Sequence, residues 1–152
     1  MSQLMNFTKL YLASDHGGVV LKDAIKTHLE SKGLPFEDLG PESGESVDYP
    51  DYAEKCAMAL KDNPEAGGII ICGSGIGISI AANRHSWVRA ALVHDVTSAH
   101  LCREHNNANI LALGERLTGV TTALECVDSF LETAFEGGRH ARRVDKLTNL
   151  PK

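Results

Sequence analysis

The sequence predicts an α/β fold, a single three-layer α/β/α domain over residues 1–152 with a five-stranded, parallel, Rossmann-like sheet. Three observations predict it. Five short apolar runs alternate with amphipathic segments, the connections are only a few residues long, and the third run, Gly68–Cys72, is rich in β-branched residues. Alternating strands and helices are typical of a parallel sheet covered on both faces. An unbroken β-branched run suits a strand buried at the centre of such a sheet.

The first two strand–helix units lie before residue 63. Residues 9–14 (KLYLAS) predict the first strand, and residues 17–31 predict a helix because their apolar residues recur at i, i+3 and i+4. Residues 36–39 predict a weaker second strand. Residues 52–60 predict a second helix, which ends at an Asp-Asn-Pro turn because the residue before proline disfavours the helical conformation.

The remaining three units repeat this order. Strands are expected at residues 68–72, 88–93 and 109–113, and helices from the glycine loop at 73–77 to about residue 84, at 97–105 and at 121–135. Outside these units, residues 1–7 are predicted to be a loose tail and residues 139–150 a C-terminal helical segment.

Composition restricts the partners and the location. The chain has 15 Lys and Arg against 20 Asp and Glu, a net charge of -5, which argues against nucleic acid and anionic membranes because both attract positive charge. The four cysteines form no C-x-x-C pair, so neither a zinc knuckle nor a redox motif is expected. The N-terminal residues lack the apolar core of a secretory signal, and we expect a reducing, cytoplasmic location.

Polar residues cluster where the predicted strands and helices end. Parallel sheets bind ligands at the carboxyl ends of their strands, so these residues are the first candidates for a site. They are Ser14–Gly18, Cys72–Gly77, His94-Asp95, His105–Asn107 and Glu115-Arg116.

The segment CGSGIG at 72–77 is the most informative of these. Backbone N–H groups at a helix start attract negative charge, and glycine lets a ligand approach the backbone closely. A cysteine in that field is stabilised as the thiolate, the form that a base or a nucleophile requires. The segment therefore predicts an anion cradle with a reactive thiol.

Other interpretations of this loop are weaker or remain open. A dinucleotide-binding fingerprint needs a third glycine at Ile78, although Asp95 lies at a suitable distance for a ribose-binding carboxylate. A P-loop needs a lysine after the glycines, and a cysteine phosphatase needs an arginine at position 78; both are missing. Tight packing around a buried, inert cysteine fits the loop taken alone.

The basic C-terminal segment is a second candidate. Arg139 and Arg143 lie four residues apart, on one face if the segment is helical, and two guanidinium groups there suit a phosphate. The alternative is a solvated basic face paired with Glu132, Glu136 and Asp145.

The histidines give no metal-binding pattern. His100, Cys102 and His105 are close in sequence, but positions 100 and 105 are about 140° apart on a helix, so no metal is expected. His16 and His105 follow predicted elements beside Asp15 and Asn106, where a group titrating near neutral pH can act in catalysis.

Six segments carry a family resemblance: ASDHGG at 13–18, SVDYPDYA at 46–53, ICGSGIGISIAANR at 71–84, VRAAL at 88–92, REHNNANILALGER at 103–116 and EGGRHARRV at 136–144. Together they resemble the ribose-5-phosphate isomerase type B family, which also includes the galactose-6-phosphate isomerase subunits. The resemblance extends from about residue 9 to residue 150. The combination of the cysteine–glycine loop with the HN and GGRH motifs is specific.

The resemblance implies interconversion of ribose 5-phosphate and ribulose 5-phosphate, in the pentose phosphate pathway, without metal or cofactor. Cys72 matches the family's base, which moves a proton from C2 to C1 through a cis-enediolate. His105 matches the acid that opens the sugar ring, Ser74 a hydroxyl that serves O1 and O2, and Asp15 a residue that contacts the sugar.

The expected substrate-binding residues follow from the same match and from the cradle. They are Asp15, His16, Gly73, Ser74, Gly75, Ile76, Gly77, Asn106, Arg116, Arg139 and Arg143. The arginines among them would hold the phosphate, whereas Arg142 matches no such position.

The family also implies a homodimer or homotetramer whose active sites are lined by two chains. One branch lacks the cysteine and has a glutamate at position 78, so Cys72 and Ile78 indicate the cysteine-base branch. Two alternatives remain: an isomerase of a six-carbon 6-phosphate (allose or galactose 6-phosphate), and a non-catalytic module that binds sugar phosphates or nucleotides.

Overall fold

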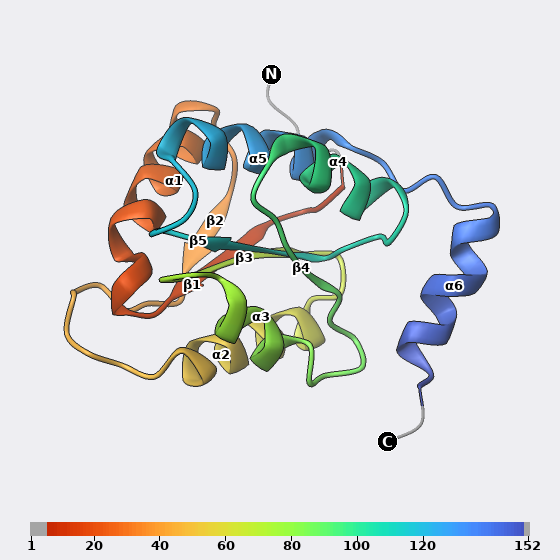
Figure 1. Cartoon of the computed structure of the whole chain (residues 1–152), viewed down its shortest axis with the longest axis horizontal. Coiled ribbons are helices and arrows are strands. Elements are labelled where there is room, and N and C mark those ends of the chain that lie inside the picture. The colour runs from red at the N-terminus through yellow and green to blue at the C-terminus, as the bar shows by residue number, and fades with distance from the viewer. Residues whose placement is uncertain (1–5, 151–152) are drawn as a thin grey trace.

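The computed structural model describes residues 6–150, in which a parallel sheet lies between two layers of helices (Figure 1). The strands are β1 (Leu10–Ser14), β2 (Phe36–Asp38), β3 (Gly67–Cys72), β4 (Ala90–Leu92) and β5 (Ile110–Gly114). The helices are the short 3-10 helix η1 (His16–Gly18), α1 (Val19–Ser31), α2 (Tyr49–Asp62), α3 (Ile76–Ala82), α4 (Val96–Glu104), α5 (Val120–Glu132) and α6 (Arg139–Thr148). The sheet order is β2-β1-β3-β5-β4, with every pair parallel. The predicted three-layer α/β/α class and its five-stranded parallel sheet are confirmed.

The side chains of β1 alternate between two apolar cores. Leu10 and Leu12 pack with buried residues of α1, α4 and α5, whereas Tyr11 and Ala13 pack with those of α2 and α3. Figure 1 shows the same division, with α1, α4 and α5 on one face of the sheet and α2 and α3 on the other. β3 is buried along its whole length, as its β-branched sequence predicts.

Several predicted boundaries are wrong. The fourth strand covers only Ala90–Leu92, because the N–H of Val88 donates to the carbonyl of His85 in a turn. α2 begins three residues earlier than predicted, since Pro50 fits the first turn of a helix, where its missing N–H has no partner to lose. α5 ends at Glu132, and an extended segment at 133–138 leads to α6. Across residues 6–150, every helix falls short of the length and apolar character that a membrane span requires.

The predicted loose tail at 1–7 is wrong for its last two residues, while residues 1–5 lie outside the described part of the chain. Phe7 is buried, and its ring stacks on Phe130 with centroids 5.0 Å apart. Asn6 donates to three carbonyls at the end of α5, among them that of Thr133 at 2.7 Å. These carbonyls have no partner within the helix, so Asn6 caps it.

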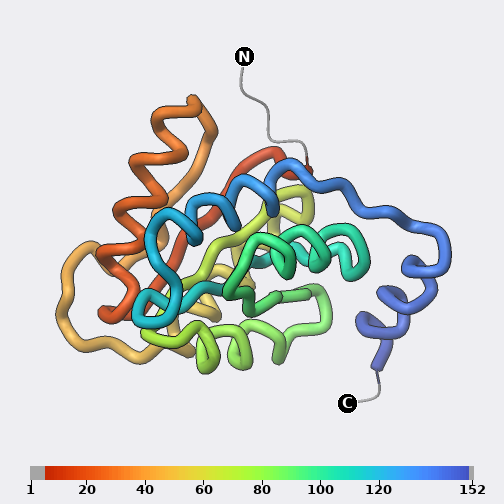
Figure 2. The backbone as a smooth tube through the Cα atoms, turned by 45° about the horizontal axis from the view of Figure 1, so that its top comes forward, coloured from red at the N-terminus to blue at the C-terminus, as the bar shows by residue number. Residues whose placement is uncertain are grey.

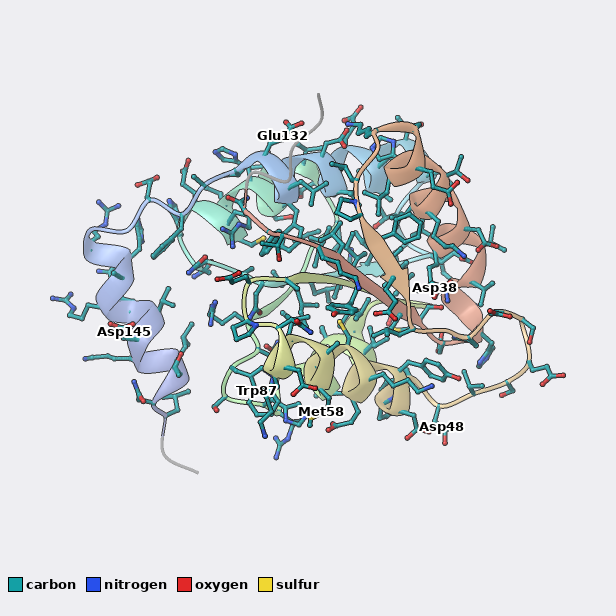
Figure 3. The ribbon with its side chains drawn as sticks, turned by 180° about the vertical axis from the view of Figure 1, so that it is seen from behind. Asp38, Asp48, Met58, Trp87, Glu132 and Asp145 are labelled. Carbon is teal, nitrogen blue, oxygen red and sulfur yellow. The ribbon has the colours of Figure 1, made fainter. Side chains whose placement is uncertain are left out.

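A buried ion pair joins α1 to the end of β2. Lys22 Nζ lies 2.9 Å from Asp38 Oδ1, and the Lys22 side chain is only 1% exposed (Figure 3 labels Asp38). Burial raises the pKa of Asp38, but hydrogen bonds from Lys22, the Gly40 N–H and Lys26 outweigh it, so the pKa is lowered. The carboxylate is therefore charged in the folded protein at neutral pH.

α6 stands apart from the three layers, at the end of the extended segment 133–138 (Figures 1 and 2). Gly137 and Gly138 precede it with φ angles of +69° and +55°, which glycine adopts readily. A groove of about 1090 Å³ lies between residues 147–150 at the end of α6 and residues from the 83–91 segment.

Candidate active site

The expected ligand crevice lies at the carboxyl ends of β1 and β3. The chain passes from β1 to β2 on one side, and β3 then joins β1 on the other side. Connections that leave neighbouring strands in opposite directions open a crevice at this edge of the sheet. Cys72 is the last residue of β3 and pairs with Gly114 of β5, so the thiol lies at this edge.

The glycine loop turns back onto the Cys72 thiol. The N–H of Gly75 donates to Cys72 Sγ at 3.1 Å, and α3 begins at the next residue. Gly75 has a φ of +80°, and a Cβ there would lie 2.6 Å from Leu92 Cδ1 and 2.9 Å from the carbonyl carbon of Leu113. This position therefore requires glycine for its backbone conformation and for its space. The loop thus places a hydrogen-bond donor at the sulfur.

Asp15 and His16 follow β1 at the same edge of the sheet. The buried Asp15 carboxylate accepts the N–H of Gly17 at 2.8 Å, and the Cα of Gly17 faces the backbone of Gly73. His16 is exposed, and its Nδ1 accepts the N–H of Val47 at 3.2 Å. A neutral His16 ring consequently carries its proton on Nε2.

Backbone hydrogen bonds join the three loops at this edge. The N–H of Asp15 donates to the backbone carbonyl of Ile71. The N–H of Glu115 donates to the carbonyl of Cys72 at 3.0 Å, and that of Arg116 to the carbonyl of Gly73 at 2.9 Å. The Arg116 side chain passes over Gly73, where a Cβ would lie 3.1 Å from its Cδ. The structure thus brings Asp15, His16, the 72–77 loop and Arg116 together.

Tyr49 is a neighbour of the site that the sequence analysis missed. A Cβ on Gly77 would lie 2.6 Å from Tyr49 Cζ, so the ring lies directly on the start of α3. In the sequence, the only signal for this contact is the glycine at position 77. The structure shows that its φ is not in the left-handed region. A glycine that the backbone does not require indicates a close neighbour.

The other predicted residues lie at the opposite edge of the sheet. His105 and Asn106 follow α4 and precede β5, so they lie near the amino end of that strand. Cys72 pairs with Gly114 at the other end of β5, and the five residues of this strand span about 15 Å. Arg139 and Arg143 lie on α6, and the ring of His140 on the same helix stacks on the ring of His105. Within one chain, these residues do not meet the Cys72 loop.

The side chains of Arg139 and Arg143 are exposed, and within residues 6–150 they form no ion pair. The alternative in which they pair with Glu132, Glu136 and Asp145 is therefore not what the structure shows. Unpaired guanidinium groups on one helix face remain available to an anion.

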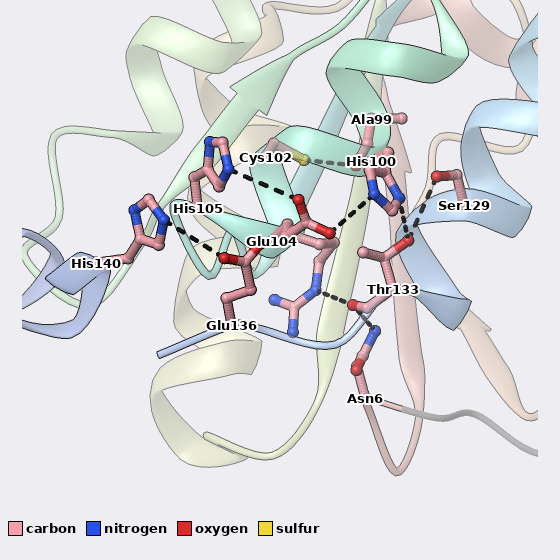
Figure 4. Close-up of polar contacts among 11 residues, drawn as sticks. Asn6, Ala99, His100, Cys102, Glu104, His105, Ser129, Thr133, Glu136 and His140 are labelled. Carbon is pink, nitrogen blue, oxygen red and sulfur yellow. Dashed lines mark hydrogen bonds and ion pairs between the residues drawn. The ribbon is translucent and has the colours of Figure 1, made fainter. Parts of the chain in front are cut away.

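The imidazole rings of His105 and His140 stack, with centroids 4.3 Å apart and planes 14° apart (Figure 4). Burial, and then the charges of His105 and Arg139, lower the pKa of His140. The two other residues considered with His105 as metal ligands have different partners. Cys102 Sγ donates to the carbonyl of Ala99, and His100 Nε2 lies 3.0 Å from Glu104 Oε2. The set His100, Cys102 and His105 thus does not form a metal site.

Burial keeps the other three thiols protonated. It raises the pKa of Cys56 to about 12, and the pKa of Cys102 and of Cys126 to about 11. Thiols with such raised pKa values are inert. Cys72 is buried as well, and it differs from them in the loop N–H that donates to its sulfur.

Fold and site together define the class of the protein: an α/β enzyme with a cysteine at the switch point of a parallel sheet. The chain belongs to the ribose/galactose isomerase family, whose model matches residues 10–147. The family resemblance drawn from the sequence motifs is confirmed.

Relatives match over nearly their whole length. Ribose-5-phosphate isomerase B of Escherichia coli is 44% identical over 140 residues, 92% of this chain and 94% of the relative. The solved ribose-5-phosphate isomerase B of Clostridium thermocellum has a TM-score of 0.91 at 48% identity, covering 93% of this chain and 96% of the other. That of Mycoplasma genitalium, solved with bound ribulose-5-phosphate, has a TM-score of 0.90 at 44% identity, covering 95% and 96%.

Proposed function

We propose that this chain is an aldose–ketose isomerase that interconverts ribose 5-phosphate and ribulose 5-phosphate. The observation that carries the proposal is the Cys72 thiol at the switch-point crevice, with the N–H of Gly75 aimed at its sulfur. The M. genitalium relative with bound ribulose-5-phosphate supports this substrate class.

In the proposed mechanism, the Cys72 thiolate removes the proton on C2 of the open-chain sugar. The electron pair of the C–H bond forms a double bond between C1 and C2, and the aldehyde oxygen becomes an oxyanion of a cis-enediolate. Backbone N–H groups of the 73–77 loop and the Ser74 hydroxyl stabilise that charge, which is usually the largest contribution to such catalysis. The thiol returns its proton to C1 as the proton of the C2 hydroxyl passes to the O1 oxyanion, which leaves a carbonyl at C2 and a hydroxyl at C1 and gives the ketose. No metal or cofactor takes part.

Ring opening and phosphate binding use the second group of residues. His105 donates a proton to the ring oxygen, Asp15 accepts the proton of the C1 hydroxyl as the aldehyde forms, and Arg139 and Arg143 bind the phosphate. Since about 15 Å separates the two edges of the sheet, we propose that a second copy of the chain supplies the second group. A two-fold homodimer, alone or within a tetramer, gives two equivalent composite sites.

The first test follows ribulose 5-phosphate formation from ribose 5-phosphate in the presence of EDTA. Wild-type turnover that persists with EDTA and is lost in Cys72→Ala, with an unchanged circular dichroism spectrum, supports the thiol as base. Undiminished turnover in Cys72→Ala contradicts this role. Saturable ligand binding without turnover in the wild type indicates the binding-module alternative.

A complementation experiment tests the shared site. Cys72→Ala and His105→Ala are each expected to be inactive, and their mixture after subunit exchange is expected to regain about a quarter of wild-type activity. Half of the dimers are then mixed, and each has one site with both native residues. If both residues of a site come from one chain, the mixture stays inactive.

The family description names galactose as well as ribose, so the length of the substrate is a separate question. We expect the ratio of kcat/KM for ribose 5-phosphate to that for allose or galactose 6-phosphate to exceed about tenfold, because one carbon in a pocket changes binding by about 1–3 kcal/mol. A ratio below one makes the six-carbon sugar the substrate.

A further inference from the structure

Three potential metal ligands meet where α4 ends and α6 begins. One ligand atom from each of His105, Glu136 and His140 lies within 4.8 Å of the other two (Figure 4). The backbone there is held in place: the N–H of Glu136 donates to the carbonyl of Glu104, and the N–H of His140 to that of Gly137, both at 3.0 Å. The cluster is thus built from two segments whose positions are fixed independently of the side chains.

His140 is the residue that points to a missing ligand. Its side chain is 8% exposed, and its Nε2 is buried without a hydrogen-bond partner among residues 6–150. That nitrogen faces Glu136 Oε1 at 3.8 Å, which is too long for a hydrogen bond. Buried polar atoms nearly always have a partner, so an atom or ion between these two groups would satisfy both.

The chemistry of the three groups selects a transition metal. Two imidazoles and one carboxylate form a ligand set typical of zinc, with a fourth position left for water or another ligand. Donors around a tetrahedral zinc ion lie about 3.3 Å apart, so the cluster must contract by about 1.5 Å. The half-buried His105, 37% exposed, and Glu136, 49% exposed, are free to rotate toward the fixed His140. His105 leaves its stacked position when it does so.

We propose that His105, Glu136 and His140 form a binding site for a divalent transition metal ion, zinc in particular. Glu104, whose Oε1 lies 3.6 Å from His105 Nε2, adds a second carboxylate that offsets the charge of the ion. This metal takes no part in isomerisation. Because the proposed function assigns ring opening to His105, an ion on that ring inhibits the enzyme; this consequence, unlike the binding itself, rests on the proposed function.

Binding is measured by isothermal titration of zinc chloride into the full-length protein after EDTA treatment and dialysis. The titration uses a Cys72→Ala background, which removes the other candidate ligand in a proposed site. We expect one ion per chain with micromolar affinity. Glu136→Gln, at an exposed position, weakens binding by about tenfold or more. The matched control Glu132→Gln, exposed and outside the cluster, leaves it unchanged.

The absence of saturable binding, or equal affinity in Glu136→Gln and the Glu132→Gln control, overturns the site. A second variant, His140→Gln, checks the buried ligand, with circular dichroism as the test of folding. Activity separates the two proposals, using enzyme that retains Cys72. Zinc is expected to inhibit ribose 5-phosphate turnover reversibly, with EDTA restoring it, and to inhibit Glu136→Gln only at higher concentration. If zinc binds at His105 while turnover of ribose 5-phosphate stays complete, the metal site is supported. The proposed role of His105 in ring opening is then contradicted.

Discussion

Replacing Gly75 with alanine tests the geometry of the thiol loop. At the Gly75 φ of +80°, an L-residue costs about 1–2 kcal/mol. The new Cβ would also lie 2.6 Å from Leu92 Cδ1 and 2.9 Å from the carbonyl carbon of Leu113, and such overpacking costs about 1–3 kcal/mol. We therefore expect a loss of about 2–5 kcal/mol of unfolding free energy, or about 4–20 °C in Tm for a chain of this size.

The same change moves the N–H that donates to Cys72 Sγ at 3.1 Å. Losing one donor to an oxyanion lowers kcat by about 10²–10³ in other enzymes, and because the change displaces the N–H groups of the 73–77 loop as well, we expect a fall of that order in kcat/KM. Calorimetric melting and the ribulose 5-phosphate assay measure the two effects. Gly44→Ala is the matched control, because a Cβ there meets no atom of the described chain (6–150) within 4 Å. A Gly75→Ala protein with the Tm and activity of the Gly44→Ala control would refute the reasoning.

Three further predictions concern reactivity and stability. Under native conditions, iodoacetamide is expected to modify Cys72 first, because burial raises the pKa of the other three thiols to about 11 or 12; mass spectrometry identifies the site, and simultaneous labelling of all four contradicts the assignment. Lys22→Ala is expected to cost up to about 3 kcal/mol in urea unfolding at pH 7, since it leaves the largely buried Asp38 with weaker pairing. Because the pKa of Asp38 is lower in the folded than in the unfolded chain (about 3.9), the charged carboxylate stabilises the fold at pH values above 3.9, and this stabilisation is lost as the pH falls through the folded pKa. The difference in unfolding free energy between wild type and variant should therefore narrow below about pH 4. A constant difference down to pH 2.5 argues against the ion pair. Asn6→Ala is expected to lower stability by about 1–3 kcal/mol through the uncapped carbonyls of α5, whereas Thr8→Ala, at an exposed position, changes it little.

Local patterns were sufficient where neighbouring residues determine the structure. The β-branched run ending at Cys72 and the glycines after it specify a buried strand, a tight turn and a helix start within a few residues. The sequence therefore located the thiol loop, and the alternation of strands and helices located the edge of the sheet where it lies.

Contacts between distant residues left no such pattern. The sequence predicts a tail at Asn6 because its partners, at the end of α5, lie more than 120 residues away in sequence. Likewise, the motifs containing His105 and Arg139 identified those residues, but not their place at the far edge of the sheet, which depends on how α4 and α6 pack. The meeting of Glu136 with two histidine rings required the same tertiary information.

Backbone hydrogen bonds connect the loops after β1, β3 and β5. Substitutions within these loops are therefore expected to be tolerated less well than substitutions outside them. A change at Cys72, Gly73 or Asp15 disturbs backbone that is hydrogen-bonded to a neighbouring strand or loop, so the backbone around the thiol tolerates little adjustment. The 40–48 loop and α6 are outside this network, apart from single contacts such as that of Val47 with His16. Redesign of substrate length should therefore start in these two segments, where a longer sugar can be accommodated without altering the backbone around the thiol.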